Sequence, residues 1–196
     1  MALRQPQVEP KLLTEAELMA LGGDARVEVL DGEVIRMSPN GMQHQFIAVN
    51  ILRLLDAYLL THDLGYVFAD STFYLLDASA RGVKGAQVPG VSFVRKGRFP
   101  AGFDLRRPFP GAPDLAVEVV SPGDEVAVLL DRVRRYLAHG TDQVWVVYPD
   151  QGELHQYRRD DPSVITWQRG QTLDAGALLP GFALPLEAVF TLPEMG

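Results

Sequence analysis

The chain of 196 residues is 47% hydrophobic and 22% charged, which suits a compact domain with its own core. The absence of cysteine excludes disulfides and thiolate-bound zinc, and the formal net charge of −7 argues against non-specific coating of nucleic acid. Because no apolar run approaches the roughly 20 residues that span a bilayer, and residues 1–12 lack a secretory signal, we expect a cytoplasmic protein without membrane contact.

The first third of the chain carries signals for two helices and a hairpin. Thr14 and Glu17 have the spacing of a capping box, which predicts a short helix over residues 15–21. Two alternating runs flank the Asp-Gly pair at 31–32, the strongest short-range signal for a tight β-hairpin. Apolar residues then recur at helical spacing over residues 47–59, which predicts an amphipathic helix of about five turns that covers a sheet.

The rest of the chain predicts mainly strands. A second amphipathic helix, which ends at Gly140, is expected to turn Val126, Leu129, Leu130, Val133 and Leu137 inward. Strands are predicted over residues 65–76, 87–94, 114–120 and 143–148, a hairpin over 152–169, and a closing segment with a short helix over 179–190.

This order of elements is typical of a mixed sheet with helices packed against it. We therefore expect an α/β (α+β) protein with an N-terminal hairpin. Residues 1–12 are predicted to form a flexible tail and residues 13–196 a single domain.

One region departs from the negative charge of the whole chain. Residues 81–107 contain seven basic residues and a single acid, Asp104. Such a run is most often a solvated, mobile loop, here over residues 95–113, but it also suits an edge that faces phosphates. On the second interpretation, substrate would be bound by Arg95, Lys96 and Arg98.

Several common catalytic motifs are missing. The sequence has no G-x-G-x-x-G after a strand, no Walker-type phosphate loop and no G-x-S-x-G elbow. The four histidines are at least 16 residues apart, so no histidine metal motif is present. His44 falls on the inward face of its helix, where a hydrogen-bonded core histidine is more common than a metal ligand.

Glu118 lies within the predicted buried strand of PDLAVEVVSPGD, where its carboxylate needs a metal, a cation or a hydrogen-bond donor to replace lost hydration. Asp114 shares its face of the strand but lies about 13 Å away at ~3.4 Å per residue, so the two cannot hold one small cation. Arg132 on the next helix is one candidate partner, and a divalent ion with ligands from neighbouring elements is the other.

Six segments in a fixed order carry a family resemblance: VEVLDGEVIRMSP, HQFIAVNILRLLDAYL, VPGVSFV, PDLAVEVVSPGD, LLDRVRRYLAHGTDQVWVVYPD and LPGFALPLEAVF. From about Thr14 to Phe190 the chain resembles the Uma-type family of restriction endonucleases, a branch of the PD-(D/E)XK nuclease superfamily. The resemblance implies a restriction-endonuclease-like core in which two glutamates and an aspartate bind a divalent cation. It also implies a lysine that orients or activates the attacking water, while the metal polarises the phosphodiester.

Carried over onto this sequence, the resemblance gives Glu28 and Glu118 as the expected ligands of Mg²⁺ or Mn²⁺. The family's aspartate falls on Gly90, which brings no oxygen. Its lysine falls on Arg132, which offsets charge but stays protonated and cannot act as a base. The expected catalytic set is therefore Glu28, Glu118 and Arg132, with Asp70, Glu33, Asp124 or Glu125 as candidate replacements for the missing aspartate.

Three functions remain open at this point. The chain is a metal-dependent DNA endonuclease, an impaired nuclease fold kept as a DNA- or protein-binding module, or an interaction module in which Glu118 and Arg132 form a structural pair. The two changed positions favour the second. DNA is the expected partner, and the apolar closing segment and the resemblance both suggest a homodimer.

Overall fold

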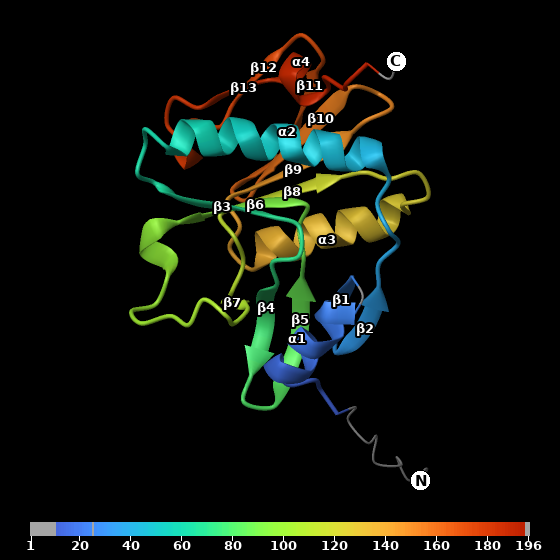
Figure 1. Ribbon diagram of the computed structural model, residues 1–196, viewed down its shortest axis with the longest axis vertical. Coiled ribbons are helices and arrows are strands. Elements are labelled where there is room, and N and C mark those ends of the chain that lie inside the picture. Colours follow the sequence, from blue (N-terminus) through green and yellow to red (C-terminus); the bar gives the residue numbers. More distant parts are fainter. Residues whose placement is uncertain (1–10, 25, 195–196) are drawn as a thin grey trace.

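The computed structural model describes residues 11–24 and 26–194 (Figure 1). This part of the chain forms a six-stranded sheet in the upper half of the view, a five-stranded sheet in the lower half and a small two-stranded sheet. The predicted class, a mixed sheet flanked by helices, is confirmed, although the strands divide into separate sheets.

The five-stranded sheet contains the predicted N-terminal hairpin. Helix α1 (Glu15–Asp24) begins at the predicted capping box, in which the Thr14 N–H donates to Glu17 Oε2 (2.7 Å) and the Glu17 N–H to Thr14 Oγ1 (3.2 Å). The hairpin turns at Asp31 (φ 52°) and Gly32 (φ 86°), which have the left-handed conformation that a tight hairpin turn needs. The strand order is β2 (Glu33–Arg36), β1 (Val27–Leu30), β5 (Gly82–Gln87), β4 (Tyr74–Ser79) and β7 (Phe109–Pro110).

The six-stranded sheet lies between the two longer helices, α2 (Met42–Leu59) and α3 (Val126–Ala138), as Figure 1 shows. Its central strands β8 and β9 run parallel, and α3 connects them. The strand order is β11 (Asp161–Gln168), β10 (Glu153–Arg158), β9 (Gln143–Tyr148), β8 (Leu115–Val119), β6 (Val91–Arg95) and β3 (Gly65–Ala69).

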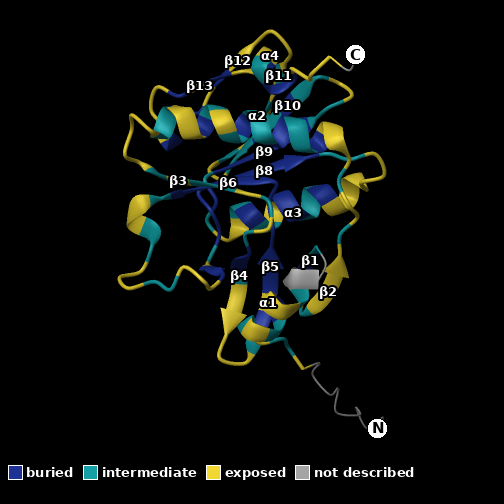
Figure 2. Cartoon of the chain, in the orientation of Figure 1, coloured by how far each residue is buried: buried dark blue, intermediate teal, exposed yellow. Residues whose placement is uncertain are grey.

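Strand β8 is buried along its whole length, as predicted (Figure 2). Its odd-numbered residues pack with the core under α2, whereas Ala116 packs with the core under α3. Because side chains alternate between the faces of a strand, Glu118 shares the face of Ala116 and is directed towards α3. The alternation of side chains along β8 therefore decides that the partner of Glu118 comes from the α3 side of the sheet.

Three predicted details are wrong. Residues 65–76 do not form one strand, because β3 ends at Ala69 in the six-stranded sheet and β4 begins at Tyr74 in the five-stranded sheet. Residues 87–94 do not form one strand, because Gln87 ends β5 in one sheet and Val91 begins β6 in the other. Pro89 lies in the break and has no N–H for a sheet hydrogen bond. On α3, Val126 is 66% exposed instead of facing inward, and the buried residues are Leu129, Arg132, Val133 and Tyr136.

The closing segment is part of the core. It contains β12 (Thr172–Asp174), η2 (Gly176–Leu178), β13 (Ala183–Pro185) and α4 (Leu186–Val189). Its large apolar side chains, including Phe182 and Phe190, are buried against the sheet and α2, so they do not provide the exposed surface on which the predicted homodimer rested.

The ends of the chain are only partly described. The predicted tail falls mostly on residues 1–10, which lie outside the described residues, while Lys11 pairs with the exposed Glu17. No helix in the described part of the chain is long and apolar enough to cross a membrane.

Candidate functional site

The predicted catalytic residues meet at one buried guanidinium group. Arg132 Nη2 donates to Glu28 Oε1 at 2.8 Å and to Glu118 Oε1 at 2.9 Å. All three side chains are buried, with residue exposures of 1% for Glu28, 5% for Glu118 and 7% for Arg132. We call this group the carboxylate–arginine triad.

Three elements bring the triad together. Glu28 comes from β1 in the five-stranded sheet, Glu118 from β8 in the six-stranded sheet, and Arg132 from the face of α3 that covers β8. Glu28 Oε1 also accepts the backbone N–H of Val88 at 3.0 Å, in the segment that connects the two sheets. The triad therefore lies where the two sheets meet.

Burial dominates the electrostatics of the triad. It raises the pKa of Glu118 to about 7, against the opposing effect of Arg132 and with a further rise from the Glu28 carboxylate. Burial likewise raises the pKa of Glu28, and Arg132 again opposes the shift. Burial alone would lower the pKa of Arg132, but the two carboxylates reverse this and raise it above its ordinary value. The guanidinium thus stays charged, and burial makes both carboxylates easier to protonate than exposed glutamates are.

Two further residues of this region lie outside the expected catalytic set. Tyr136 is fully buried beside Glu118, and burial followed by the nearby carboxylate raises the pKa of its hydroxyl well above the ordinary value. Its position, one turn after Arg132 on α3, was the available signal. Gln87 is fully buried at the end of β5, and within the described residues neither side-chain amide atom has a hydrogen-bond partner.

Gly90 occupies the position at which the resemblance implies an aspartate. A Cβ atom added there would lie 3.4 Å from the Val117 carbonyl oxygen and 3.8 Å from Cε1 of His44, which are ordinary van der Waals distances. Gly90 also has no positive φ. A side chain is therefore sterically acceptable at this position. A ligand oxygen is missing there only because the residue is glycine.

The candidate replacement carboxylates are engaged elsewhere or exposed. Asp70 accepts a hydrogen bond from Arg26 Nε at 3.2 Å, and Asp124 accepts the Ser121 N–H at 2.8 Å. Glu33 lies on the fully exposed strand β2, and Glu125 is exposed at the start of α3. Across residues 11–24 and 26–194, no group of three or more His, Asp or Glu side chains is arranged to hold a metal ion.

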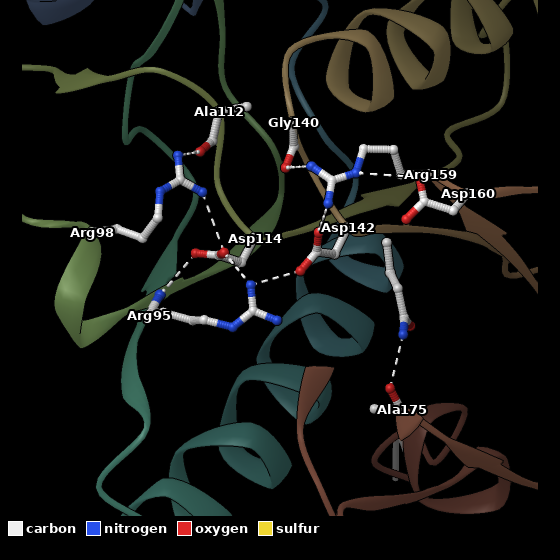
Figure 3. A network of polar contacts seen from close by, with 10 residues as sticks. Arg95, Arg98, Ala112, Asp114, Gly140, Asp142, Arg159, Asp160 and Ala175 are labelled. Atoms are coloured by element: carbon white, nitrogen blue, oxygen red, sulfur yellow. Dashed lines mark hydrogen bonds and ion pairs between the residues drawn. The ribbon is translucent and has the colours of Figure 1, made fainter. Parts of the chain in front are cut away.

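Two of the three residues predicted to bind substrate lie at the opposite end of β8. Figure 3 shows Arg95 and Arg98 directed at Asp114, and Arg95 and Arg159 directed at Asp142. Arg95 Nη1 lies 2.6 Å from Asp114 Oδ1 and 2.6 Å from Asp142 Oδ2, and Arg98 Nη1 lies 3.2 Å from Asp114 Oδ1. We call these five residues the aspartate–arginine cluster.

Lys96, the third predicted substrate-binding residue, lies outside this cluster. Its ammonium group is 2.6 Å from the carboxylate of Asp63, and both side chains are exposed. The structure therefore brings the catalytic set together but pairs each of the three basic residues with a carboxylate of the chain.

Comparisons with known proteins identify the family and the fold of the chain. Residues 13–187 match the model of the family Uma2, whose description is "Putative restriction endonuclease". The fold is similar to that in the "Crystal structure of a putative nuclease belonging to DUF820 from Anabaena variabilis ATCC 29413", with a TM-score of 0.75 and 17% sequence identity. That match covers 91% of this chain and 97% of the other. Among curated protein sequences, none matches significantly.

Proposed function

The chain belongs to the Uma2 family, and from this premise we propose that it is a nuclease-fold protein whose metal-dependent hydrolysis of DNA is impaired and which acts as a binding module. The observation that carries this proposal is the hydrogen bonding of one guanidinium group of Arg132 to both expected metal ligands, Glu28 and Glu118. The arginine provides the positive charge that a cation would otherwise provide.

A divalent ion does not fit the triad as it stands. Mg²⁺ requires oxygen ligands at about 2.0–2.1 Å in near-octahedral geometry. The oxygen that each glutamate directs to the centre of the site is already bonded to Arg132 Nη2, and Gly90 adds no third ligand. Moving Arg132 aside would leave two buried carboxylates without a cation, which is costly.

Arg132 also cannot replace the family's lysine in water activation. A guanidinium group stays protonated in proteins, so it donates hydrogen bonds but does not accept a proton. Arg132 therefore offsets negative charge but activates no water. The bases that remain for this step are Glu28 and Glu118, and both are hydrogen-bonded to Arg132.

A second candidate function is a surviving Mg²⁺- or Mn²⁺-dependent endonuclease. Two observations favour it: Glu28 and Glu118 are both present and converge, and Gly90 has space beside it for a further ligand. In that case the arginine would have to leave the carboxylates when the metal binds.

The two candidates are separated by a cleavage assay on linear and supercoiled DNA with Mg²⁺ and with Mn²⁺. We expect no metal-dependent cleavage by the unmodified protein and measurable cleavage by the double variant Gly90→Asp with Arg132→Lys. The matched control is Gly90→Asn with Arg132→Lys, which has nearly the same shape without the third carboxylate. Cleavage by the unmodified protein that Glu118→Gln abolishes would contradict the proposal and support the second candidate.

The binding role is tested on uncleaved DNA. We expect a DNA affinity that falls with increasing salt, measured by fluorescence anisotropy, because phosphate neutralisation releases counterions. A lack of DNA binding would leave a protein partner. The predicted homodimer and the cytoplasmic location remain predictions, and sedimentation of the purified chain tests the first.

A further inference from the structure

Strand β2 is an open edge of the five-stranded sheet. It is the terminal strand, and within residues 11–24 and 26–194 no other strand pairs with its outer side. All four of its residues are exposed, whereas the terminal strands β3 and β11 of the other sheet are partly covered. Figure 2 shows β2 as an exposed strand at the side of the lower sheet. An open edge is a template on which a further strand can pair.

This edge lacks the features that usually prevent pairing. Edge strands are commonly protected by proline, lysine, a bulge or very short length. Strand β11 contains Pro162 and its register with β10 shifts at Arg158, and the two-residue strand β7 ends in Pro110. Strand β2 has the sequence Glu-Val-Ile-Arg, without proline or lysine, and its register with β1 is regular. The edge is therefore suited to a partner strand.

The hairpin decides which backbone groups of β2 face outward. The Met37 N–H donates to the Arg26 carbonyl oxygen of the other hairpin strand at 2.9 Å. Hydrogen-bonded and non-hydrogen-bonded pairs alternate along an antiparallel ladder, so Ile35 also bonds β1. The N–H and C=O groups of Val34 and Arg36 therefore point away from the sheet, where a further strand can bond them.

The side chains of β2 complement a second copy of the same strand. The strand begins with the acid Glu33 and ends with the base Arg36, and the apolar residues between them, Val34 and Ile35, are 39% and 36% exposed. An antiparallel copy brings the acidic end of one strand to the basic end of the other and joins the two apolar centres. A parallel copy would instead align like charges, which is destabilising.

We propose that β2 pairs antiparallel with β2 of a second copy, about a two-fold axis at Ile35, and so joins the two five-stranded sheets into one. In this register Val34 of each copy lies opposite Arg36 of the other, so the outward backbone groups of both residues are bonded. A register centred on Val34 would place Arg36 opposite Gly32, whose N–H already donates to the Lys84 carbonyl oxygen at 2.8 Å. The hydrogen bonds therefore favour the axis at Ile35.

This pairing has a consequence for the triad. Glu28 lies directly opposite Ile35 in the hairpin, and residues opposite each other share a face of the sheet. A two-fold axis perpendicular to the joined sheet would place both triads on one face, with the Glu28 Cα atoms about 15 Å apart across four strands. The inference goes beyond the proposed function, because it concerns how two copies assemble and does not depend on whether the triad binds a metal or DNA.

Sedimentation equilibrium of the full chain over a concentration series measures the assembly. Two short strand edges bury less than a standard interface, so we expect a weak dimer with a Kd of about 1–100 μM. Ile35→Lys places like charges at the axis, and Val34→Pro removes an outward N–H, so each should weaken the dimer tenfold or more. Because that N–H does not bond β1, Val34→Pro keeps the hairpin and covers the case in which Ile35→Lys misfolds.

Single cysteines test the register, because the chain has no cysteine of its own. In Ile35→Cys the two Cα atoms would lie about 4.5 Å apart, within the range of a disulfide, whereas in Val34→Cys they would lie beyond the limit of about 7 Å. The two positions are similarly exposed, so Val34→Cys is the matched control for random collision. We expect mild oxidation to link Ile35→Cys alone into a covalent dimer, which a non-reducing gel detects.

The control for sedimentation is Val164→Lys on the edge strand β11, where the valine is 46% exposed, and it should leave the Kd unchanged. The proposal is overturned if the chain is monomeric at every concentration, which would leave the edge to an extended segment of another protein. It is also overturned if a dimer survives both Ile35→Lys and Val34→Pro, if Val164→Lys weakens it equally, or if the two cysteine variants oxidise to the same extent.

Discussion

Two ion clusters occupy the two ends of strand β8, and their charge balance is opposite. At Glu118 the triad contains two carboxylates and one arginine, all at least 90% buried. At the other end the aspartate–arginine cluster has three arginines and two aspartates, and of its side chains only Asp114 is fully buried. One strand thus separates a buried excess of acid from a partly exposed excess of base.

The difference shows which cluster needs a further partner for its charges. A partly exposed excess of arginine is solvated, so the cluster at Asp114 needs no further partner. A buried excess of carboxylate is costly unless a proton or a cation completes it. The triad therefore retains the charge pattern of a cation site, with a monovalent guanidinium where the family uses a divalent metal.

Among the changes to the two clusters, removing Arg132 should reduce the free energy of unfolding most. In Arg132→Met the two buried carboxylates lose the guanidinium group that is hydrogen-bonded to both, so we expect the free energy of unfolding to fall by about 3–5 kcal/mol at pH 7. Urea denaturation measures it. The control is Arg134→Met on the exposed side of α3, where the change should stay within about 0.5 kcal/mol. Equal losses in the two variants would show that the ion pairs of the triad contribute no more to stability than an exposed arginine does.

The acid excess of the triad should also make stability depend on pH. The pKa of Glu118 is raised from 4.5 to about 7 by burial, so between these values the native state holds a proton that the unfolded state has lost. Its stabilising contribution is complete below about pH 4.5 and is lost as the pH rises through 7, which amounts to up to about 3 kcal/mol.

Urea denaturation at a series of pH values tests this dependence. The variant Glu118→Gln stays neutral at every pH, so the difference between its stability and that of the unmodified chain should change most between pH 4.5 and 7. A difference that is constant over this window would contradict the raised pKa.

At the other end of β8, Asp114→Asn should cost less than the loss of Arg132. The carboxylate of Asp114 accepts the Arg95 N–H at 2.9 Å as well as both guanidinium groups, so we expect a loss of about 1–3 kcal/mol. The loss is limited because the side chains of Arg95 and Arg98 are 39% and 35% exposed and can reach water. Asp104→Asn, which affects only an exposed pair with Arg106, is the matched control. If Asp114→Asn loses more stability than Arg132→Met, the aspartate–arginine cluster contributes more to stability than the triad does.

Local signals in the sequence predicted most of the fold. The capping box at Thr14, the turn at 31–32 and the helical spacing of residues 47–59 each depend on neighbours in sequence, and all three appear in the structure. Strand β5 was not predicted because its residues, GVKGAQ, include two glycines and no clear alternation. It is held by pairing with β1 and β4, which sequence periodicity does not reveal.

The candidate site was predicted as a set of residues with one candidate contact, between Glu118 and Arg132, which the structure shows, but the meeting of Glu28 with the same arginine was not predicted. Apolar periodicity assigned Val126 to the inner face of α3, whereas the inner face carries Arg132. Periodicity assigns a charged residue such as Arg132 to the interior only when its ion-pair partners are known. One of these partners, Glu28, lies 104 residues away in sequence, so the pattern of α3 does not reveal it. Whether these residues catalyse a reaction is not decided by their proximity and remains a prediction.

The smallest expected effect on stability is that of Lys96→Ala, which also tests whether Lys96 contacts DNA. Its pair with Asp63 is exposed on both sides, at 51% and 83% of the side chains, so Lys96→Ala should change stability by at most about 0.5 kcal/mol. Arg95 and Arg98 are held by the buried Asp114, whereas Lys96 can exchange Asp63 for a phosphate at little cost. If it does so, Lys96→Ala should reduce the slope of log affinity against log salt by about 1, while Asp63→Asn should increase the affinity. An unchanged slope in Lys96→Ala would remove Lys96 from the DNA interface and leave Arg95 and Arg98 as the remaining candidates among the three predicted substrate-binding residues.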